Sequence, residues 1–329
     1  MTREPSVEEG DPSQPRIAVL VPCYNEALTI EKVIRDFRQQ LPRSRICVYD
    51  NNSSDDTASR ARAAGAEVVS EKHRGKGHVI AAMLRDIEAD FYVMVDGDYT
   101  YPASHVPLLI APVVEGRADI VVGNRLVTYA EGAYRPLHVL GNRLVVSAIN
   151  VIFGTTLRDA MSGYRAFNRE VAQRVPVVSR GFEVETEMTL QALYRGLLIV
   201  EVPVPYGRRP EGSFSKLSTY RDGTRVLLKI VDIFKAYRPL LFFSLLGIVL
   251  ALSGMALGAI PVIEFFRTGM VRRFPTAILA AALEVMALVS ISCGVILDSV
   301  NHHFRELSQL IVQTTRQGSG RSGETARRP

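Results

Sequence analysis

The stretch Phe91–Asp98, FYVMVDGD, joins an apolar run to two aspartates that lie one residue apart. Five apolar residues in succession predict a strand that is buried on both faces. Asp96 and Asp98 follow where this strand leaves the core, and side chains two positions apart on a strand point the same way. Gly97 between them leaves room for a ligand to approach the backbone. Two carboxylates at one strand end suit a divalent metal ion, although an isolated D-x-D is more often a polar turn.

Strand and helix patterns alternate before this stretch. The runs Arg16–Val21, Arg45–Tyr49 and Ala66–Val69 predict strands, and a predicted helix follows each of them. Such alternation predicts right-handed crossovers and a mostly parallel central sheet flanked by helices, which is an α/β fold.

Acidic side chains follow three of these predicted strands, at Glu26, at Asp50 and at the pair Asp96 and Asp98. In an open parallel sheet, the carboxyl ends of the strands form the edge that binds ligands. A dinucleotide-binding Rossmann domain lacks support, because no G-x-G-x-x-G follows the first strand. The turn Gly75–Gly77 lacks the full spacing of a phosphate-binding P-loop, and by itself it predicts only a flexible turn.

The apolar residues of the 329-residue chain are unevenly distributed. Residues 239–263 and 275–297 form two long runs nearly free of charge, and each is long enough to cross a bilayer core of about 30 Å as a helix. A buried helical hairpin in a soluble protein is the alternative, but both runs exceed the length that a core helix needs. The net charge of +5 fits an anionic membrane surface better than nucleic acid, because no basic run interleaved with aromatics occurs.

The three cysteines, Cys23, Cys47 and Cys293, show no paired spacing, and two of them lie in predicted buried strands. They are expected to be reduced, packed thiols of a cytoplasmic domain. The amino terminus has no apolar signal region, so export of the first 235 residues is not expected.

Motifs in a fixed order resemble the catalytic domain of the family 2 glycosyltransferases. They are Pro22–Glu26 (PCYNE), then Asp50 with its Ser/Asp-rich turn, then Asp96–Asp98. Two later segments resemble elements of dolichyl-phosphate mannose synthase and its bacterial polyprenyl-phosphate relatives. Gly123–Arg125 is similar to their G-S-R element, and Asp159–Arg165 is similar to their D-x-x-S-G-F-R element.

Two further segments extend this resemblance. Glu187 is assigned to the acidic position of the F-x-x-E segment, and Gly212–Lys216 resembles the G-x-S-K element with one extra residue. The likeness covers roughly Arg16 to Lys216 and continues into the two apolar runs.

The chain also departs from the family pattern. Asn51 stands where the family often has a second aspartate, and Thr100 stands where it has a glutamine or similar ligand. In the eukaryotic and archaeal synthases an arginine and a serine contact the lipid phosphate. The corresponding positions here hold His138 and Asn142, with Arg143 adjacent.

The resemblance implies a GT-A-like fold, a nucleotide-diphosphate sugar as donor and a polyprenyl phosphate of dolichyl or undecaprenyl type as acceptor. It assigns Mg²⁺ or Mn²⁺ to Asp96 and Asp98. The residues implied in catalysis are Asp96, Asp98, Arg125 and Glu187. Those implied in nucleotide binding are Pro22, Tyr24, Glu26, Asp50, Lys76 and Asp96. Those implied in binding the lipid phosphate are Arg125, His138, Asn142, Arg143, Arg165, Arg209, Ser215 and Lys216.

An acceptor phosphate is largely a dianion at neutral pH, because its second pKa is about 6. It needs little help from a general base, but it needs cations that hold it near the anomeric carbon. Arg125 is the first candidate, because it follows the predicted strand Ala118–Val122 at the ligand-binding edge. One in-line displacement would invert the anomeric configuration, giving a β-linked product from an α-linked donor.

Each assignment has a plainer alternative. The nucleotide set can be a polar rim, Lys76 and the arginines can be solvated surface charges, and Glu187 can form an ordinary salt bridge. A processive polysaccharide synthase characteristically carries Q-x-x-R-W, and this chain has no tryptophan. A non-catalytic nucleotide-sugar-binding membrane scaffold stays open, as does transfer to another lipid or to a polysaccharide.

The predicted organisation has seven parts: a disordered leader (1–15), a catalytic domain (16–218), juxtamembrane amphipathic helices (219–238), a first transmembrane helix (239–263), a loop (264–274), a second transmembrane helix (275–298) and a basic cytoplasmic tail (299–329). Arginines in the loop weaken a simple positive-inside argument. Because nucleotide sugars are cytoplasmic, the catalytic domain and both termini of this integral membrane protein are expected there.

Glu284 lies inside the second predicted span, where an unpaired charge is costly. It is expected to be protonated, to snorkel, or to face another helix or subunit. The last alternative allows a homo-oligomer formed through the transmembrane helices.

Overall fold

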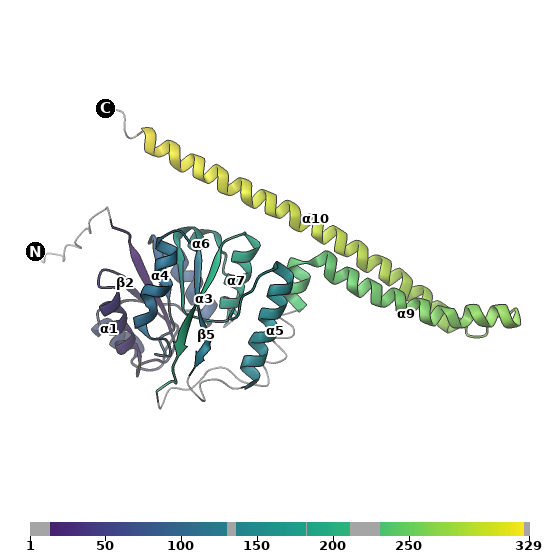
Figure 1. Cartoon of the computed structure of the whole chain (residues 1–329), viewed down its shortest axis with the longest axis horizontal. Helices are drawn as coiled ribbons and strands as arrows, with labels where there is room; N and C mark the ends of the chain where they lie inside the picture. Colours follow the sequence, from purple (N-terminus) through teal and green to yellow (C-terminus); the bar gives the residue numbers. More distant parts are fainter. Residues whose placement is uncertain (1–13, 130–135, 182, 211–230, 326–329) are drawn as a thin grey trace, which may run out of the picture. The chain divides into compact units, whose positions relative to one another are not determined.

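The computed structural model describes residues 14–129, 136–181, 183–210 and 231–325. Its contacts divide the chain into two units, residues 1–226 and 227–329. The described part of the first unit is built on a β-sheet with helices around it, and that of the second is dominated by two long helices (Figure 1).

The first unit contains seven strands and eight helical segments within the described residues. Its strands are β1 (Ile17–Cys23), β2 (Arg45–Asp50), β3 (Glu67–Ser70), β4 (Phe91–Met94), β5 (Ile120–Tyr129), β6 (Arg165–Asn168) and β7 (Ile199–Tyr206). Its helices are α1 (Ile30–Gln40), α2 (Thr57–Ala63), α3 (Lys76–Asp86), the 3-10 turn η1 (Ala103–His105), α4 (Val106–Val114), α5 (Pro136–Phe153), α6 (Arg169–Arg174) and α7 (Val184–Tyr194). The strands predicted up to Asp98 all occur, with bounds within two residues of the prediction.

The strand order in the sheet is β3-β2-β1-β4-β6-β5-β7. β6 runs antiparallel to both of its neighbours, and the other adjacent pairs are parallel. The predicted α/β fold with a mostly parallel sheet is therefore confirmed. The alternating pattern did not predict β6, which enters the sheet between β4 and β5.

β4 lies in the middle of this sheet and is covered on both faces. Val93 and Val95 pack in one buried cluster with residues of α1 and α4, whereas Tyr92 and Met94 pack in another with residues of α3 and α7. All four side chains are at most 3% exposed. Burying an apolar side chain of this size contributes about 1.5–3 kcal/mol. The predicted burial on both faces is confirmed, and this run helps to hold both helix layers on the sheet.

The carboxyl ends of β1, β2 and β4 meet at one edge of the sheet. In the parallel register, Cys23 of β1 lies opposite Asp50 of β2, and Leu20 of β1 lies opposite Met94 of β4. The acidic residues singled out in the sequence lie at these strand ends: Asp50 is the last residue of β2, and Glu26, Asp96 and Asp98 lie in the loops that follow β1 and β4. We call this the carboxyl edge.

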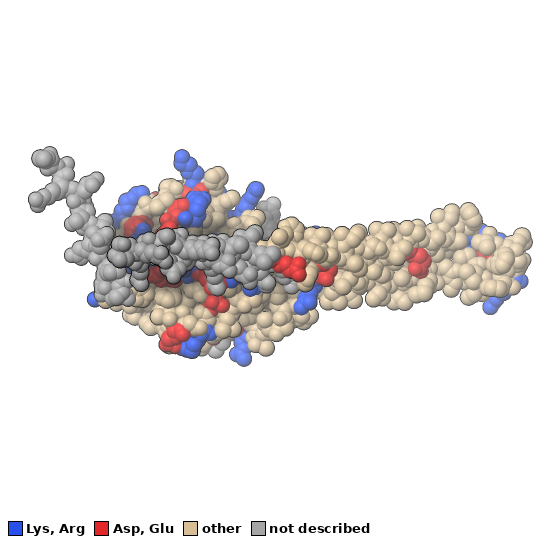
Figure 2. All heavy atoms as spheres, turned by 90° about the horizontal axis from the view of Figure 1, so that it is seen from above, with Lys and Arg blue, Asp and Glu red and all other residues tan. Residues whose placement is uncertain are grey.

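The second unit contains the helices α9 (Pro239–Thr268) and α10 (Phe274–Thr325). The parts Pro239–Thr268 and Phe274–Phe304 are long and apolar enough to cross a membrane. Both helices extend beyond the predicted spans. The predicted loop is shortened to a turn that begins at Gly269 (φ 71°), and α10 continues into the predicted tail. Figure 2 shows a long surface of this hairpin with few charges and with basic residues at its tip.

α9 and α10 pack closely because glycines face the partner helix. A Cβ atom added at Gly254 would lie 2.7 Å from Oε1 of Glu284, and one added at Gly247 would lie 2.7 Å from Cγ1 of Ile291. Small residues permit such an approach between membrane helices. Glu284 is an exposed residue, and its carboxylate lies against α9.

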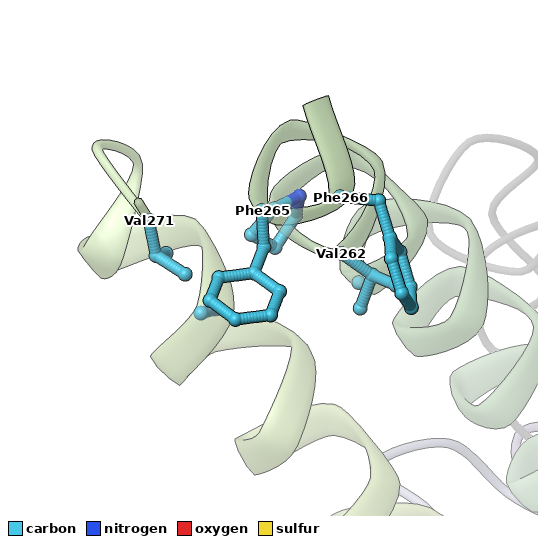
Figure 3. A pocket seen from close by; sticks show the side chains of 7 residues that line it. Val262, Phe265, Phe266 and Val271 are labelled. Atoms are coloured by element: carbon cyan, nitrogen blue, oxygen red, sulfur yellow. The ribbon is translucent and has the colours of Figure 1, made fainter. Parts of the chain in front are cut away.

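A cavity of about 450 Å³ lies near the tip of this hairpin. The side chains of Val262, Phe265, Phe266 and Val271 are among those that line it (Figure 3). No ionisable group is found among the described residues of its lining. It therefore offers no group that would bind a nucleotide or a phosphate, in contrast to the carboxyl edge.

Candidate functional site

Asp98 is buried at the carboxyl edge and is held by three contacts. Its Oδ1 accepts hydrogen bonds from Oγ1 of Thr100 at 2.6 Å and from the Thr100 amide at 3.2 Å. Its Oδ2 forms an ion pair with the Arg209 guanidinium at 2.5 Å. Thr100, a departure from the family pattern, thus orients the aspartate two residues before it.

Asp96 forms an ion pair with Lys76, and Lys76 also pairs with Glu185. Only 11% of the Lys76 side chain is exposed. Burial by itself would lower the pKa of this ammonium group, but the carboxylates of Asp96 and Glu185 raise it well above its ordinary value. Lys76 is therefore a fixed positive charge beside Asp96, in contrast to a solvated surface lysine.

Glu185 is a site residue that the sequence analysis missed. Counting the F-x-x-E segment from Phe182 leads to Glu185, two positions before the residue that was assigned. Glu187 instead accepts hydrogen bonds from the amides of Val178 and Ser179, at 3.0 and 2.8 Å. Glu187 thus supports a loop, and its contact with sugar hydroxyls stays a prediction.

The turn Gly75–Gly77 packs against this same loop through its backbone. A Cβ atom at Gly77 would lie 1.8 Å from the Ser179 carbonyl oxygen, and one at Gly75 would lie 2.0 Å from that of Arg180. The glycines are needed because no side chain fits there. Their packing fixes the start of α3, where Lys76 lies.

Asp50 and Glu26 are also buried at the carboxyl edge. Oδ2 of Asp50 accepts from the Ser53 amide at 3.2 Å, whereas its Oδ1 is buried without a hydrogen-bond partner within the described part of the chain. The Glu26 amide donates to Oγ1 of Thr57 at 2.8 Å. A buried carboxylate oxygen without a donor is costly, so Asp50 is suited to accept from a ligand. Pro22 and Cys23 are the last two residues of β1, and Tyr24, which follows them, is half-buried.

Arg125 extends from β5 and forms an ion pair with Asp159 at 2.9 Å. Its guanidinium also lies 5.7 Å from the ring centroid of Tyr206. The carboxylate of Glu201 accepts from the backbone amide of Asp159 at 2.7 Å, which fixes this segment. The D-x-x-S-G-F-R-like segment therefore begins with a residue that holds the predicted arginine in place.

Arg165 lies in the core and not at the surface of the site. It is 0% exposed, and its guanidinium donates to the carbonyls of Ser162 and Ala160 and to Oγ1 of Thr189, at 2.8, 2.8 and 2.9 Å. A side chain with no exposed surface cannot touch a ligand in this arrangement. The placement does not support the predicted phosphate contact, because the guanidinium donates to carbonyls of its own loop and to Thr189 of α7.

The remaining predicted acceptor residues are distributed differently. Asn142 is buried, and its Nδ2 lies 3.5 Å from the Arg158 carbonyl oxygen. Arg143 and Arg158 are exposed and line a cavity of about 580 Å³ that also has apolar walls from Leu126 and Leu157. The side chain of His138 in α5, and residues Ser215 and Lys216, lie outside the described residues.

The candidate metal centre contains two carboxylates. Across the side chains that the structure describes, no group of three or more His, Cys, Asp or Glu residues is placed to hold a metal ion. Asp96 and Asp98 alone leave most ligand positions of a hard cation to other oxygen donors.

Comparison with known proteins gives matches over most of the chain. The family model for glycosyl transferase family 2 matches residues 18–175. Glycosyltransferase AglJ from Haloferax volcanii is 34% identical over 307 residues, which cover 93% of this chain and 97% of the relative. The dolichyl-phosphate hexose transferase of the same organism is 28% identical over 66% of this chain and 93% of its own length.

A solved structure is similar as well. It is glucosyl-3-phosphoglycerate synthase from Mycobacterium tuberculosis in complex with Mn²⁺ and uridine-diphosphate-glucose, with 26% identity, a TM-score of 0.54, and coverage of 67% of this chain and 78% of that one. The expected GT-A-like fold is confirmed by this likeness together with the sheet. With a relative matched over nearly its whole length, the chain belongs to glycosyltransferase family 2.

Proposed function

We propose that this glycosyltransferase moves a hexose from a nucleotide-diphosphate sugar to the phosphate of a membrane polyprenyl phosphate. The observation that carries the proposal is that one chain joins a nucleotide-sugar-binding fold to two helices long and apolar enough to cross a membrane. A relative named dolichyl-phosphate hexose transferase supports a lipid-phosphate acceptor.

On the donor side, Asp50 and Glu26 contact the nucleoside. The unpartnered Oδ1 of Asp50 accepts from a base N–H or a ribose hydroxyl, which satisfies a buried oxygen. Lys76 supplies a positive charge to the diphosphate, because it lies next to Asp96 and is held by Glu185. Pro22 and Tyr24 complete the nucleotide side from the end of β1.

Asp96 and Asp98 are the residues that would hold Mg²⁺ or Mn²⁺. Their hard oxygens suit either ion, and the oxygens of the donor diphosphate would supply further ligands. A bound divalent cation neutralises charge on the leaving nucleotide. Thr100 keeps Oδ1 of Asp98 oriented, and Arg209 balances the charge of its Oδ2. The Mn²⁺ in the M. tuberculosis synthase is consistent with divalent metal use here.

On the acceptor side, cations hold the phosphate close to the anomeric carbon. Arg125 is the first of these, because Asp159 and the Tyr206 ring fix its guanidinium near the carboxyl edge. Arg209 and Lys216 are further candidate cations, and Lys216 lies in the segment that resembles the G-x-S-K element. Arg143 and Arg158 add two guanidinium groups to a cavity with apolar walls, which suits a phosphate attached to a prenyl chain. A dianionic phosphate attacks without a general base, and one displacement inverts the anomeric configuration.

The two apolar helices support a reaction at a membrane surface. Nucleotide sugars are cytoplasmic, so we assign residues 16–218 and both termini to the cytoplasmic side. Residues 219–238 connect this unit to the first span. Glu284 makes association through the second span a further proposal, since an intramembrane carboxyl favours a polar partner.

The test is transfer of label to lipid. Membranes that contain the protein are incubated with a panel of labelled nucleotide sugars, polyprenyl phosphate and Mg²⁺ or Mn²⁺, and label is counted in the organic-soluble fraction. One sugar nucleotide is expected to transfer label, and D98A is expected to lose about 100-fold or more. D56A serves as the control, because Asp56 is exposed and makes no side-chain cap hydrogen bond.

Three results would contradict the proposal or one of its parts. Binding of a nucleotide sugar without any transfer would favour the scaffold alternative. Undiminished transfer by D98A would remove the assigned metal site while leaving the family intact. Label in another lipid or in polysaccharide would change the acceptor alone.

A further inference from the structure

We propose that Asn51 is a positioning residue that sets Lys76 against the second phosphate of the donor. The inference rests on the proposed function in one respect, that Asp50 contacts the nucleoside and Lys76 the diphosphate. Asn51 connects Asp50 with the loop that precedes Lys76. It follows Asp50 directly, and its side chain reaches the loop that ends at Lys76.

The Asn51 carboxamide forms three hydrogen bonds with this loop. Its Nδ2 donates to the carbonyl oxygens of Glu71 at 3.3 Å and His73 at 2.7 Å. Its Oδ1 accepts from the Gly75 amide at 2.7 Å. The residue is 7% exposed, so water competes little for these groups. The side chain therefore fixes three backbone groups in the five residues that precede Lys76.

The backbone of Asn51 is fixed to the sheet. Its amide donates to the Cys23 carbonyl oxygen at 2.9 Å, which continues the pairing of β1 and β2. The Asn51 side chain thus connects a rigid strand end with Gly75. Gly75 has a φ of 130° and precedes the first residue of α3, which is Lys76.

A second contact fixes the other side of Gly75. The loop held by Glu187 packs against Gly75 and Gly77, and the Gly77 amide lies 3.3 Å from the Arg180 carbonyl oxygen. Lys76 is therefore positioned from two sides, by Asn51 and by this loop. If Gly75 lost its hydrogen bond to Asn51 and shifted, the ammonium group of Lys76 would move relative to Asp96 and to a bound diphosphate.

Only a carboxamide satisfies all three loop groups at this place. An aspartate accepts from the Gly75 amide, but it has no donor for the two carbonyls and sets a negative charge against their oxygens. The second aspartate that the family often has here is therefore incompatible with this loop conformation. Asn51, which replaces the second aspartate of the family pattern, thus holds the loop before Lys76 in place.

The experiment measures nucleotide binding without turnover. The full-length protein in detergent is titrated calorimetrically with UDP and UMP, and with GDP and GMP, to find the series that the parent binds. The parent is expected to bind the diphosphate more tightly than the monophosphate. N51D is expected to lose tenfold or more in affinity for the diphosphate and less than twofold for the monophosphate. N51A, which removes the bonds without adding a charge, is expected to lose the diphosphate preference in the same way.

N168D is the matched control. The Asn168 side chain also forms hydrogen bonds of both kinds. Its Nδ2 donates to Oδ1 of Asp119 at 2.9 Å, and its Oδ1 accepts from the Val171 amide at 3.0 Å. It lies opposite Phe91, at the start of β4, and so at the other edge of the sheet. N168D is expected to keep the ratio of diphosphate to monophosphate affinity.

The outcomes separate this inference from the proposed function. Equal losses for both nucleotides in N51D and N51A, or no loss for either, would overturn the positioning role while the donor assignment stands. A lowered ratio in N168D as well would also overturn it, because general loosening would then explain the effect. A parent that binds no nucleoside diphosphate would overturn the donor assignment itself, and this inference with it.

Discussion

Lys76 places a positive charge where solvent hardly reaches. It lies between Asp96 and Glu185, and its neighbours on the chain are glycines that pack against backbone. The two carboxylates outweigh burial and keep its pKa above the ordinary value. The ammonium group is therefore charged at neutral pH, and it holds two acidic side chains together that would otherwise repel each other.

Replacing Lys76 by Met tests this arrangement through stability. Removing one partner of a buried ion pair typically costs about 3–5 kcal/mol, because a buried charge remains uncompensated. K76M is therefore expected to unfold at a lower temperature than the parent, measured by circular dichroism in detergent. The double variant K76M/E185Q is expected to recover part of the loss, because Gln has the shape of Glu185 without its charge. A double variant less stable than K76M would contradict the repulsion argument.

Elements with a strong apolar pattern were predictable, and short ones with a buried polar residue were not. The run at β4 has apolar residues at every position, so its burial on both faces followed from the sequence. β6 has four residues and begins with Arg165. A charged residue is not expected in the core, so the sequence did not predict a buried strand there. Arg165 is accommodated only because Ser162, Ala160 and Thr189 accept from it, and Thr189 comes from α7.

The F-x-x-E motif counted from Phe182 points to Glu185, so the assignment of Glu187 misplaced the motif by two residues, and the rotation of α7 shows the consequence. Val184, Met188 and Ala192 pack in the core, and this sets the face of the helix. Glu185 then reaches Lys76, whereas Glu187 reaches the loop at Val178. The contact between Arg209 and Asp98 was equally beyond prediction, because it joins segments that no local pattern connects.

The close packing of α9 against α10 depends on Gly254. A side chain there meets the Glu284 carboxylate and the Ala280 carbonyl oxygen, 3.2 Å from an added Cβ atom. G254L is expected to lower the thermal stability of the hairpin, because a backbone carbonyl cannot move aside as a flexible side chain can. A256L, at an exposed position of the same helix, is the control and is expected to have little effect. Equal unfolding temperatures for the two variants would contradict the close packing.

At the scale of the whole molecule, the proposed reaction requires the sheet domain and the polyprenyl phosphate to meet on one side of the bilayer. In this proposal both helices cross the membrane, and two spans return the chain to the side from which it entered. The turn between α9 and α10 must then lie on the opposite side. Arg267, Arg272 and Arg273 near this turn run against the positive-inside tendency, so the orientation rests on the cytoplasmic location of nucleotide sugars.

Thiol labelling in intact cells tests this orientation. The native Cys23 and Cys47 are buried and Cys293 lies within α10, so they are expected to give little background. Val271 in the turn is 40% exposed and Leu28 in the sheet domain is 64% exposed, which makes both suitable for cysteine substitution. V271C is expected to react with a membrane-impermeant maleimide added outside the cells, whereas L28C is expected to react only after permeabilisation. Labelling of L28C from outside, with V271C protected, would place the donor site away from cytoplasmic nucleotide sugars and contradict the proposed reaction.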